Sequence, residues 1–378
     1  MAALHARVYP ASGWASPDAY GEYLREMLLH NPWVDPEVPS WVAQEDGRLF
    51  AFLGVVPRRM RFGSRALRVA VSCQLMVDPQ RRSSFAAPAL LRRFFAGPQD
   101  LSIADGANDA SRGLWEASGG IASPLHSLHW VRLLRPAQAL LSLAGGRLRA
   151  LSPVAGPIAA LVDACIGSSF EAKYDEEPLD AAGLHGALQE IGHYTLRPDD
   201  DARTLEWLLA QAAQKRRHGS LQGALARAAD GRIAGWFLYY LNGAVSQVLQ
   251  LGARRGAMGE ILEQLAAHAR ARGARALEGR MEPELTTALR GKRCLMQNRA
   301  IWTLLHARDQ GLLVPFLRGG AFFSRLDGEW WMRFSGEGSD LHARPQLDHA
   351  IGGDVEVVGD VAGVARHGRK QVLAPARH

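Results

Sequence analysis

The sequence has few cysteines and no long apolar run. Its three cysteines, Cys73, Cys165 and Cys294, lie far apart in a chain of 378 residues. They therefore form neither a disulfide framework nor the closely spaced ligands of a metal site. No segment approaches the roughly eighteen uninterrupted apolar residues of a membrane-spanning helix, and the N-terminus lacks the apolar core of a signal peptide. We expect a cytoplasmic protein with no membrane span and no metal.

Lysine is also scarce, and arginine supplies most of the positive charge. The formal net charge of +6 suits a polyphosphate ligand, and it also permits nucleic acid or an anionic membrane surface. Against nucleic acid, the cations are spread along the chain, and neither a zinc spacing nor an aromatic RNA-binding motif is present. With 47% apolar and 22% charged residues the chain is globular, and its length has room for two ordinary domains.

The sequence between Leu67 and Gly120 is predicted to alternate strands and helices. Residues 67–77 form an apolar, β-branched strand that ends in a turn rich in arginine. A helix with one apolar stripe follows at residues 88–95, then a short strand at residues 101–104 and a second helix at residues 108–119. Two parallel strands, a basic turn and an open helix N-terminus together predict an anion site.

The same order of elements starts again in the second half of the chain. Asp230-Gly231-Arg232 repeats the hairpin turn Asp46-Gly47-Arg48, because Asp-Gly accepts the positive φ of a type I′ turn. A strand at residues 245–251 leads to the basic turn Arg254-Arg255-Gly256, a helix with the earlier apolar spacing, and a strand at residues 276–278. An internal repeat is therefore the main feature of the organisation.

The basic turn of the first half matches a pattern in which Val-x-Pro precedes Arg/Gln-x-x-Gly-x-Gly/Ala. Val77-Asp78-Pro79 supplies the first part, and Arg82 stands in the Arg/Gln place. The two glycine places then hold Phe85 and Ala87, and both places shift by one residue if Arg81 is the arginine. A bulky side chain in a glycine place is a clear departure from this pattern.

The second helix carries a more specific match, to Asn-x-x-Ala-x-x-x-Tyr-Glu-x-x-Gly-Phe. The residues at these spacings are Asn108, Ser111, Trp115, Glu116, Gly119 and Gly120. In the second half the basic turn fits Arg-x-x-Ala-x-Gly, with only Ala257 departing mildly from the pattern. These patterns are those of the GCN5-related N-acetyltransferase (GNAT) family, which the chain resembles as a tandem, two-domain member.

The resemblance implies an α/β (α+β) fold of two GNAT-like domains. Each would be a mixed, mostly antiparallel sheet with helices on both faces and a splayed central pair of parallel strands. The expected parts are an N-terminal domain at 1–135, a helical connector at 136–190, a C-terminal domain at 191–334 and a partly disordered tail at 335–378. We expect residues 125–134 to be a strand of the first domain, and residues 301–306 and 321–334 to be closing strands of the second.

The resemblance also implies acetyl-CoA or acyl-CoA as the acyl donor, with its pyrophosphate against backbone N–H groups of the turn and helix N-terminus. Such a site requires converging N–H donors and no side chain that blocks close approach. Because Phe85 stands in a glycine place, the second half is the better donor site. The residues expected along the donor are Met76, Val77, Arg82 and Asn108 in the first half and Val248, Leu249, Arg254, Arg255, Gly256, Ala257, Met258 and Gly259 in the second.

Acyl transfer to an amine also needs a base, and the leaving thiolate often needs an acid. The family's acid is a tyrosine of the second helix, which Trp115 cannot replace because an indole N–H does not donate its proton at neutral pH. We expect Glu278 or Asp105 as the base, since each follows a turn arginine by a similar interval at matching strand ends. Tyr239 and Tyr240 are alternatives for the acid, and structural roles stay open for all of these residues.

We expect an enzyme that moves an acyl group from acyl-CoA, or from an acyl-carrier-protein thioester, to an amine of a small molecule. One half would work and the other would be degenerate, as in many tandem members of the family. Two alternatives stay open. The first is a non-catalytic CoA-binding, metabolite-binding or scaffold protein with degenerate GNAT domains, and the second is an aminoacyl-tRNA-dependent transferase, whose affinity for RNA would fall steeply with salt.

Overall fold

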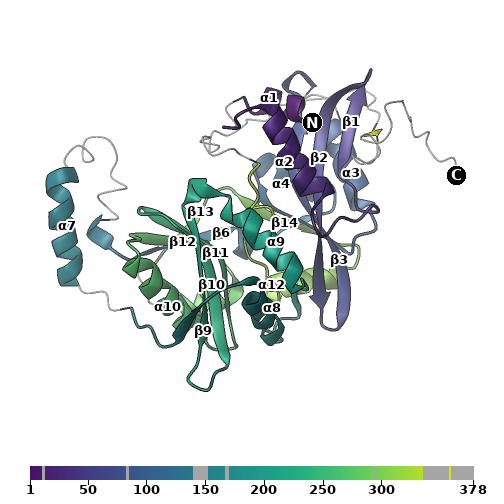
Figure 1. Cartoon of the computed structure of the whole chain (residues 1–378). Coiled ribbons are helices and arrows are strands. Elements are labelled where there is room, and N and C mark those ends of the chain that lie inside the picture. The colour runs from purple at the N-terminus through teal and green to yellow at the C-terminus, as the bar shows by residue number, and fades with distance from the viewer. Residues whose placement is uncertain are drawn as a thin grey trace. The chain divides into compact units, whose positions relative to one another are not determined.

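The structure, a computed structural model, describes residues 1–10, 13–81, 85–138, 152–166, 170–290, 292, 294–334 and 357–358. For residues 152–155, 164–166 and 357–358 it describes the backbone alone. These residues fall into two compact units (Figure 1). Unit 1 contains Met1–Ser123, Ile301–Val314 and the described residues from Gly328 onward, and unit 2 contains Pro124–Ala300 and Pro315–Asp327.

Unit 1 is built around one mixed sheet. Its helices are α1 (Ala2–Val8), α2 (Pro17–Leu29), α3 (Ala86–Phe95) and α4 (Asp109–Ala117), with 3₁₀ turns at Pro79–Arg81 and Gln310–Leu313. Its strands are β1 (Trp41–Glu45), β2 (Arg48–Phe62), β3 (Arg65–Val77), β4 (Leu101–Ala107), β5 (Ile121–Ala122), β14 (Trp302–His306) and β15 (Val357–Val358). The order across the sheet is β15-β1-β2-β3-β4-β14-β5, and β3 and β4 are its parallel pair.

Unit 2 is built around a second mixed sheet. Its helices are α7 (Ser152–Ile166), α8 (Ala181–Glu190), α9 (Ala202–Ala213), α10 (Met258–Ala271) and α11 (Pro283–Ala288), with 3₁₀ turns at Leu125–Ser127 and Arg216–His218, and α12 (Val314–Arg318) starts at the unit boundary. Its strands are β6 (Leu128–Leu133), β7 (Asp175–Pro178), β8 (Leu196–Pro198), β9 (Ser220–Arg227), β10 (Ile233–Leu241), β11 (Val245–Ala253), β12 (Ala276–Arg280) and β13 (Cys294–Asn298). The order across this sheet, to which β8 does not belong, is β13-β6-β12-β11-β10-β9-β7, and β11 and β12 run parallel.

Local sequence explains where the main elements begin and turn. The Ser16 hydroxyl accepts the N–H of Ala19 at 3.1 Å, and Pro17 fills the first position of α2, where no N–H is needed. The β1–β2 hairpin turns through Asp46 and Gly47, whose φ values of 48° and 76° are those of the expected type I′ turn. Capping and turn chemistry therefore fix these boundaries as the sequence predicts.

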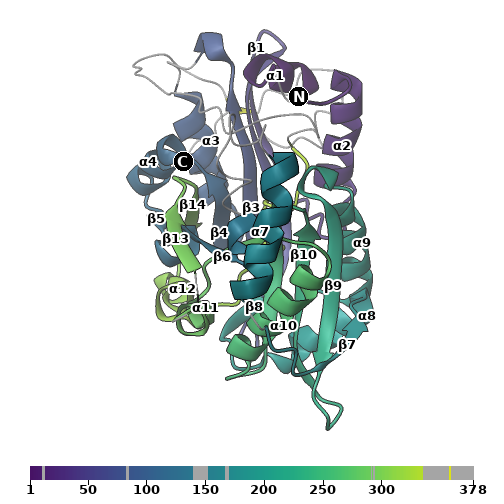
Figure 2. The same ribbon diagram turned by 90° about the vertical axis from the view of Figure 1, so that its left-hand side faces the viewer.

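Helices cover both faces of each sheet. In unit 1, α2 and α3 lie on opposite faces (Figures 1 and 2), and the α3 residues Leu90, Leu91 and Phe94 are buried in the core against the sheet. In unit 2, neighbouring β10 residues point to opposite helices: Tyr239 bonds His268 of α10, whereas Tyr240 donates to the Ala212 carbonyl of α9. The expected fold class, two mixed sheets with helices on both faces and a parallel strand pair, is confirmed.

The two units share an order of elements, and they exchange their closing strands. The series β1-β2-β3-α3-β4-α4-β5 of unit 1 recurs in unit 2 as β9-β10-β11-α10-β12-α11-β13. The strand after β5 is β6, and it lies between β12 and β13 of unit 2. The strand after β13 is β14, and it lies between β4 and β5 of unit 1. Each sheet is therefore completed by a strand that follows the other series in the sequence.

This exchange changes where two expected strands belong. Residues 125–134 do contain a strand, β6, but it pairs in unit 2 rather than with the first half of the chain. Residues 301–306 contain β14, which closes the sheet of unit 1 rather than that of the second half. A pattern of alternating residues identifies a strand but not its partner, because pairing depends on residues far away in the sequence.

The expected strand at residues 321–334 is not formed. Ala321 makes a single parallel bridge to Leu196, and the chain then runs through turns. The carboxylate of Asp327 accepts hydrogen bonds from the N–H and the hydroxyl of Ser324, both at 2.6 Å. Side-chain hydrogen bonds of this kind hold the backbone in a turn, so it does not pair with a neighbouring strand. This apolar stretch is therefore irregular, although its side chains are buried.

Two other expected segments lie partly outside the described residues. The connector at 136–190 contains α7, β7 and most of α8, whereas residues 139–151 are not described. Of the tail at 335–378, only Val357–Val358 is described, as a strand antiparallel to β1.

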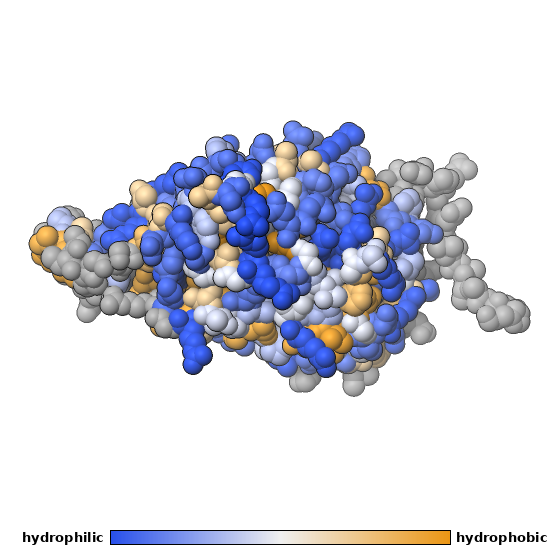
Figure 3. Space-filling model, turned by 90° about the horizontal axis from the view of Figure 1, so that it is seen from below, coloured by the Kyte–Doolittle hydropathy of each residue, from blue (hydrophilic) through white to orange (hydrophobic). Residues whose placement is uncertain are grey.

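The helix α7 has an apolar surface. Ile158, Leu161 and Val162 lie on one face by their spacing and are 58%, 67% and 40% exposed. Figure 3 shows apolar atoms on this helix at the left of the view. In the described part of the chain, however, no helix is both long and apolar enough to cross a membrane.

The strand exchange predicts that a substitution in β14 destabilises unit 1. The side chain of Leu304 is fully buried in the unit 1 core, so Leu304→Ala should lower the free energy of unfolding by about 2–5 kcal/mol. Urea denaturation measures this loss, and amide exchange should accelerate in β4 more than in β12. Leu317→Ala is the matched control, since Leu317 is 60% exposed and should change stability by less than about 0.5 kcal/mol. Equal, small effects of both substitutions would contradict the role of β14.

Candidate active site

The parallel strands of unit 1 separate after a short ladder. Val69, Ala70 and Val71 of β3 pair with Leu101, Ser102 and Ile103 of β4. Beyond this ladder β4 pairs only with β14, and β3 pairs only with β2. The facing edges of β3 and β4 therefore carry backbone groups with no strand partner, which makes this opening a place where a ligand can bond to the backbone.

A bulge in β3 lies next to the opening. The register with β2 shifts between Phe52 and Gly54, and Gln74 on the bulged strand has a φ of 51°. A positive φ is uncommon for a residue with a side chain and costs on the order of 1–3 kcal/mol. Such strain persists only where the surroundings enforce it, and it is concentrated at functional sites.

Two ionisable groups are buried beside this opening. Asp105 of β4 is 3% exposed, and its carboxylate accepts the N–H of Glu329 at 2.6 Å. Gly328 lies so close that a Cβ there would overlap the carboxylate of Asp105. Cys73 is also buried, and burial raises the pKa of its thiol well above the usual value. The thiol is therefore protonated at neutral pH and is not an activated nucleophile.

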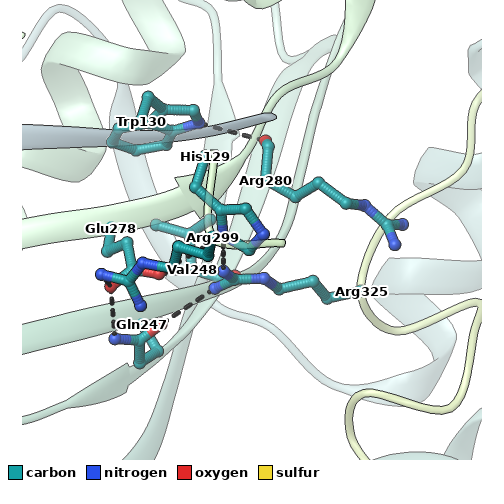
Figure 4. A network of polar contacts seen from close by, with 8 residues as sticks. All are labelled: His129, Trp130, Gln247, Val248, Glu278, Arg280, Arg299 and Arg325. Atoms are coloured by element: carbon teal, nitrogen blue, oxygen red, sulfur yellow. Dashed lines mark hydrogen bonds and ion pairs between the residues drawn. The ribbon is translucent and has the colours of Figure 1, made fainter. Parts of the chain in front are cut away.

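The parallel strands of unit 2 separate in the same way, but a side chain fills their opening. The ladder ends at the pair Gln247 and Glu278. Arg325, which is 2% exposed, donates to the carbonyl of Val248 at 3.2 Å and to the side chain of Gln247 at 3.0 Å (Figure 4). It also donates to Glu278 at 3.2 Å and to Nδ1 of His129 at 2.9 Å. The guanidinium thus lies in the opening of unit 2, whereas at the opening of unit 1 Glu329 lies beside Asp105 and Gly106.

The expected base Glu278 is an ion-paired carboxylate. Burial would raise the pKa of Glu278, but contacts with His129, Arg325, Gln247 and Arg299 lower it to about 2. Arg299 lies 2.8 Å from the carboxylate. A carboxylate with so low a pKa accepts a proton poorly, and the chemistry of this group suits a structural ion pair.

The registers also show that Glu278 and Asp105 are not counterparts. Glu278 is the last ladder residue of β12, and the matching residue of β4 is Ile103. Asp105 lies two residues further on, at the place that Arg280 holds in β12. Counting from the turn arginines gave nearly equal intervals, but the turn and helix lengths of the two halves differ. The expected equivalence of the two carboxylates is therefore wrong.

The two basic turns lead to helix N-termini with matching positions. Ala87 and Gly259 each hold the second position of their helices, α3 and α10. In unit 2, Gly256 has a φ of 84°, and a Cβ added at Gly256 or Gly259 would lie in open space. In unit 1, the N-cap is Phe85, whose side chain is 46% exposed, so its bulk is directed toward solvent.

The other expected donor residues fall into three groups. Val248, Leu249, Ala257, Met258 and Met76 are buried, Val77 and Arg254 are half-buried, and Arg255 is exposed. Asn108 caps α4 by accepting the N–H of Ser111 at 2.9 Å, which gives it a structural role. Arg82 lies outside the described residues. Backbone groups rather than these side chains would therefore make most contacts to a donor.

The residues considered as acids are engaged in packing. Trp115 is 2% exposed in the unit 1 core, where its ring contacts Phe94 and Phe95. The hydroxyls of Tyr239 and Tyr240 are buried and bonded, as described above. Within the described ranges, no group of His, Cys, Asp and Glu side chains is arranged to hold a metal ion.

Replacing Glu278 with glutamine tests its role. The substitution would leave Arg325 buried without its counter-charge, so we expect a loss of about 3–5 kcal/mol in the free energy of unfolding at pH 7. Because the pKa of Glu278 is lowered in the folded state to about 2, its contribution is present above the unfolded pKa near 4.3 and is lost as the pH falls toward 2. The difference between wild type and Glu278→Gln should therefore shrink between pH 5 and pH 3.

Glu45→Gln is the control for this measurement. Glu45 forms an exposed ion pair with Arg81, and breaking it should cost no more than about 1 kcal/mol. Urea denaturation at several pH values gives both results. If Glu278→Gln kept full stability and lost turnover instead by roughly 10²–10⁴, the carboxylate would be the base.

The close contact at Gly328 gives another test. An alanine there would push against the carboxylate of Asp105, so Gly328→Ala should destabilise unit 1 by about 1–3 kcal/mol. Gly113→Ala is the matched control, because Gly113 lies in α4 with open space around it and alanine favours a helix by about 0.5–1 kcal/mol. The melting temperature should thus fall for Gly328→Ala and rise for Gly113→Ala. A higher melting temperature for Gly328→Ala would show that Gly328 and Asp105 are not tightly packed.

Similarity to known proteins lies in the fold. No protein-family model matches the sequence, and no curated protein matches it. A GCN5-related N-acetyltransferase from Anabaena variabilis ATCC 29413 is 12% identical, with a TM-score of 0.52 over 81% of this chain and 69% of that one. One from Kribbella flavida is 15% identical, with a TM-score of 0.51 over 84% and 69%. A protein of unknown function from Enterococcus faecalis V583, described as a probable N-acyltransferase, is 10% identical, with a TM-score of 0.52 over 82% and 70%. The chain therefore has the fold of the GCN5-related N-acetyltransferases.

Proposed function

We propose that this protein transfers an acyl group from a CoA thioester to an amine of a small molecule. The observation that carries the proposal is the opening between β3 and β4, where the strand edges beyond Val71 and Ile103 have no strand partner. A thioester carbonyl placed along β3 could accept a backbone N–H there, and such a fixed donor stabilises the oxyanion that forms during acyl transfer. The structures named above as N-acetyltransferases support the same class of reaction.

We place the reaction in unit 1 because the corresponding edge in unit 2 is occupied. A thioester lying along β11 would have to displace Arg325 from Val248 and Glu278. Separating one partner of a buried ion pair from the other costs about 3–5 kcal/mol, which is comparable to the binding energy of a millimolar ligand. In this proposal Met76, Val77, Arg82 and Asn108 lie along the donor in unit 1, and Asp105 lies beside the acyl group.

The turn before α10 is a second candidate for the phosphates of the donor. There the open surface at Gly256 and Gly259, together with Arg254 and Arg255, offers N–H groups and positive charge to an anion. The donor would then bind in unit 2 as we expected from the sequence, with Arg325 displaced. A matched pair of substitutions separates the two sites.

Ala87→Leu and Gly259→Leu place the same side chain at the second helix position of α3 and α10. If the donor binds in unit 1, Ala87→Leu should weaken CoA binding tenfold or more, which is about 1.4 kcal/mol, and Gly259→Leu should leave it unchanged. Calorimetry with CoA gives both affinities. The opposite ranking would place the donor in unit 2.

Turnover is tested by release of free thiol from acetyl-CoA and longer acyl-CoA thioesters in the presence of a panel of small amines. Thiol release that depends on the amine, with an amide as product, supports the proposal. Tight CoA binding without any turnover would instead identify a binding or scaffold protein, a reading that the filled opening in unit 2 favours. Copurified tRNA with strongly salt-dependent affinity would point to an aminoacyl-tRNA-dependent transferase.

A further inference from the structure

The helix α7 of unit 2 has the opposite polarity to an ordinary surface helix. A helix at a protein surface normally turns its apolar side chains toward the core and its polar ones toward water. In α7 the only charged residue, Asp163, is 4% exposed, whereas Ile158, Leu161 and Val162 are exposed to solvent. Among residues 156–163, the part of α7 whose side chains the structure describes, every exposed residue is apolar.

Hydrogen bonds hold the polar face of α7 inward. The carboxylate of Asp163 accepts the N–H of Ala137 at 2.7 Å and the N–H of Gln138 at 3.1 Å. Ala159, which lies one turn earlier on the same face, is buried as well. A rotation that buried the apolar face would break both hydrogen bonds of this carboxylate, and a lost hydrogen bond to a charged group costs about 1.5–3 kcal/mol. The exposed apolar face is therefore a consequence of how Asp163 is bound.

The exposed face of α7 has no group that could form a hydrogen bond with a protein partner. Protein interfaces combine an apolar centre with a polar rim and form about one hydrogen bond per 100–200 Å². The exposed residues of this face have neither a donor nor an acceptor in their side chains, and they are Pro157, Ile158, Ala160, Leu161 and Val162. The hydrocarbon region of a bilayer offers no hydrogen bonds and requires none, so it matches this face better than a protein does.

The length and charge of this part of the chain indicate the surface of a bilayer. The fifteen residues of α7 extend roughly 22 Å, which is shorter than the roughly 30 Å of a hydrocarbon core. In the sequence, residues 136–162 contain two charged residues, Arg147 and Arg149, and both are positive. Cations that lie next to an apolar helix in the sequence favour a membrane with anionic head groups.

We propose that α7 docks this protein on the surface of a bilayer that contains anionic lipids. The side chains of Ile158, Leu161 and Val162 enter the boundary between head groups and acyl chains, to a depth of roughly 5–10 Å (Figure 3). Their transfer out of water drives the binding, and Asp163 keeps its hydrogen bonds on the protein side. The docking is independent of the proposed acyl transfer, which uses no residue of α7.

Flotation of the full chain with vesicles tests the docking. Wild type should float with vesicles of phosphatidylcholine and phosphatidylglycerol in equal parts. Leu161→Asp should weaken this binding at least tenfold, because the new carboxylate would have to leave water. Leu317→Asp is the matched control, since Leu317 of α12 is similarly exposed, and it should bind the vesicles as wild type does. Wild type that does not float, or equal binding by the two variants, would overturn the proposal.

A second variant and a change of lipid complete the test. Ile158→Asp on the same face should have the effect of Leu161→Asp, and both variants should keep the melting temperature of wild type because the substituted side chains are exposed. Vesicles of phosphatidylcholine alone should bind wild type more weakly, and added salt should weaken binding to the anionic vesicles. Equal binding to both kinds of vesicle would overturn the requirement for anionic lipids.

Sedimentation without vesicles distinguishes a lipid surface from a second copy of this chain. The molecular mass of wild type and of Leu161→Asp should be the same. A wild-type oligomer that Leu161→Asp converts to a monomer would show that a second copy covers α7, and this result would overturn the proposal.

Discussion

The structure depends on the exchange of the strands β6 and β14. The cores of both units are closely packed at these strands. Leu304 of β14 is fully buried in unit 1. In unit 2 the Trp130 indole of β6 lies against Gly279, where an added Cβ would come within 2.5 Å of the ring. Each contact joins residues far apart in the sequence, so loop closure opposes it and folding through it is slow. Neither series of strands completes its sheet with its own residues, and the two units must form together.

The openings between the parallel strands of the two sheets are lined by different groups. In unit 2 the opening is filled by the guanidinium of Arg325, which bonds the Val248 carbonyl and the Glu278 carboxylate. In unit 1 the opening is lined by Asp105, which accepts the N–H of Glu329, and by the strained residue Gln74 of β3. Both units contain buried polar atoms without a hydrogen bond in the described part of the chain, so the two openings differ mainly in the groups that line them.

Much of the fold could be predicted because its signals are local. The Asp46-Gly47 turn and the apolar stripe of α3 depend only on neighbouring residues and appear in the structure as expected, whereas at Asp230-Gly231 only the glycine has a positive φ. The partners of β6 and β14 could not be predicted, since no local pattern encodes them. Residues 321–334 resembled a strand by composition, but the Ser324–Asp327 hydrogen bonds decide their course.

The candidate site was less accessible to sequence reasoning for the same reason. Glu278 stood out as a strand-end carboxylate, but its main partner Arg325 is remote in the chain and carries no motif. Gly328 and Glu329, which lie against Asp105, are likewise remote from it in the chain and carry no motif. Buried polar groups are therefore judged by what surrounds them, which sequence alone does not reveal.

The exchanged strands also limit how such a gene can evolve. Here a recombination event between the two halves would separate each sheet from the strand that completes it. The two series must therefore stay on one chain, because the sheet of unit 1 takes β14 from beyond the end of the second series.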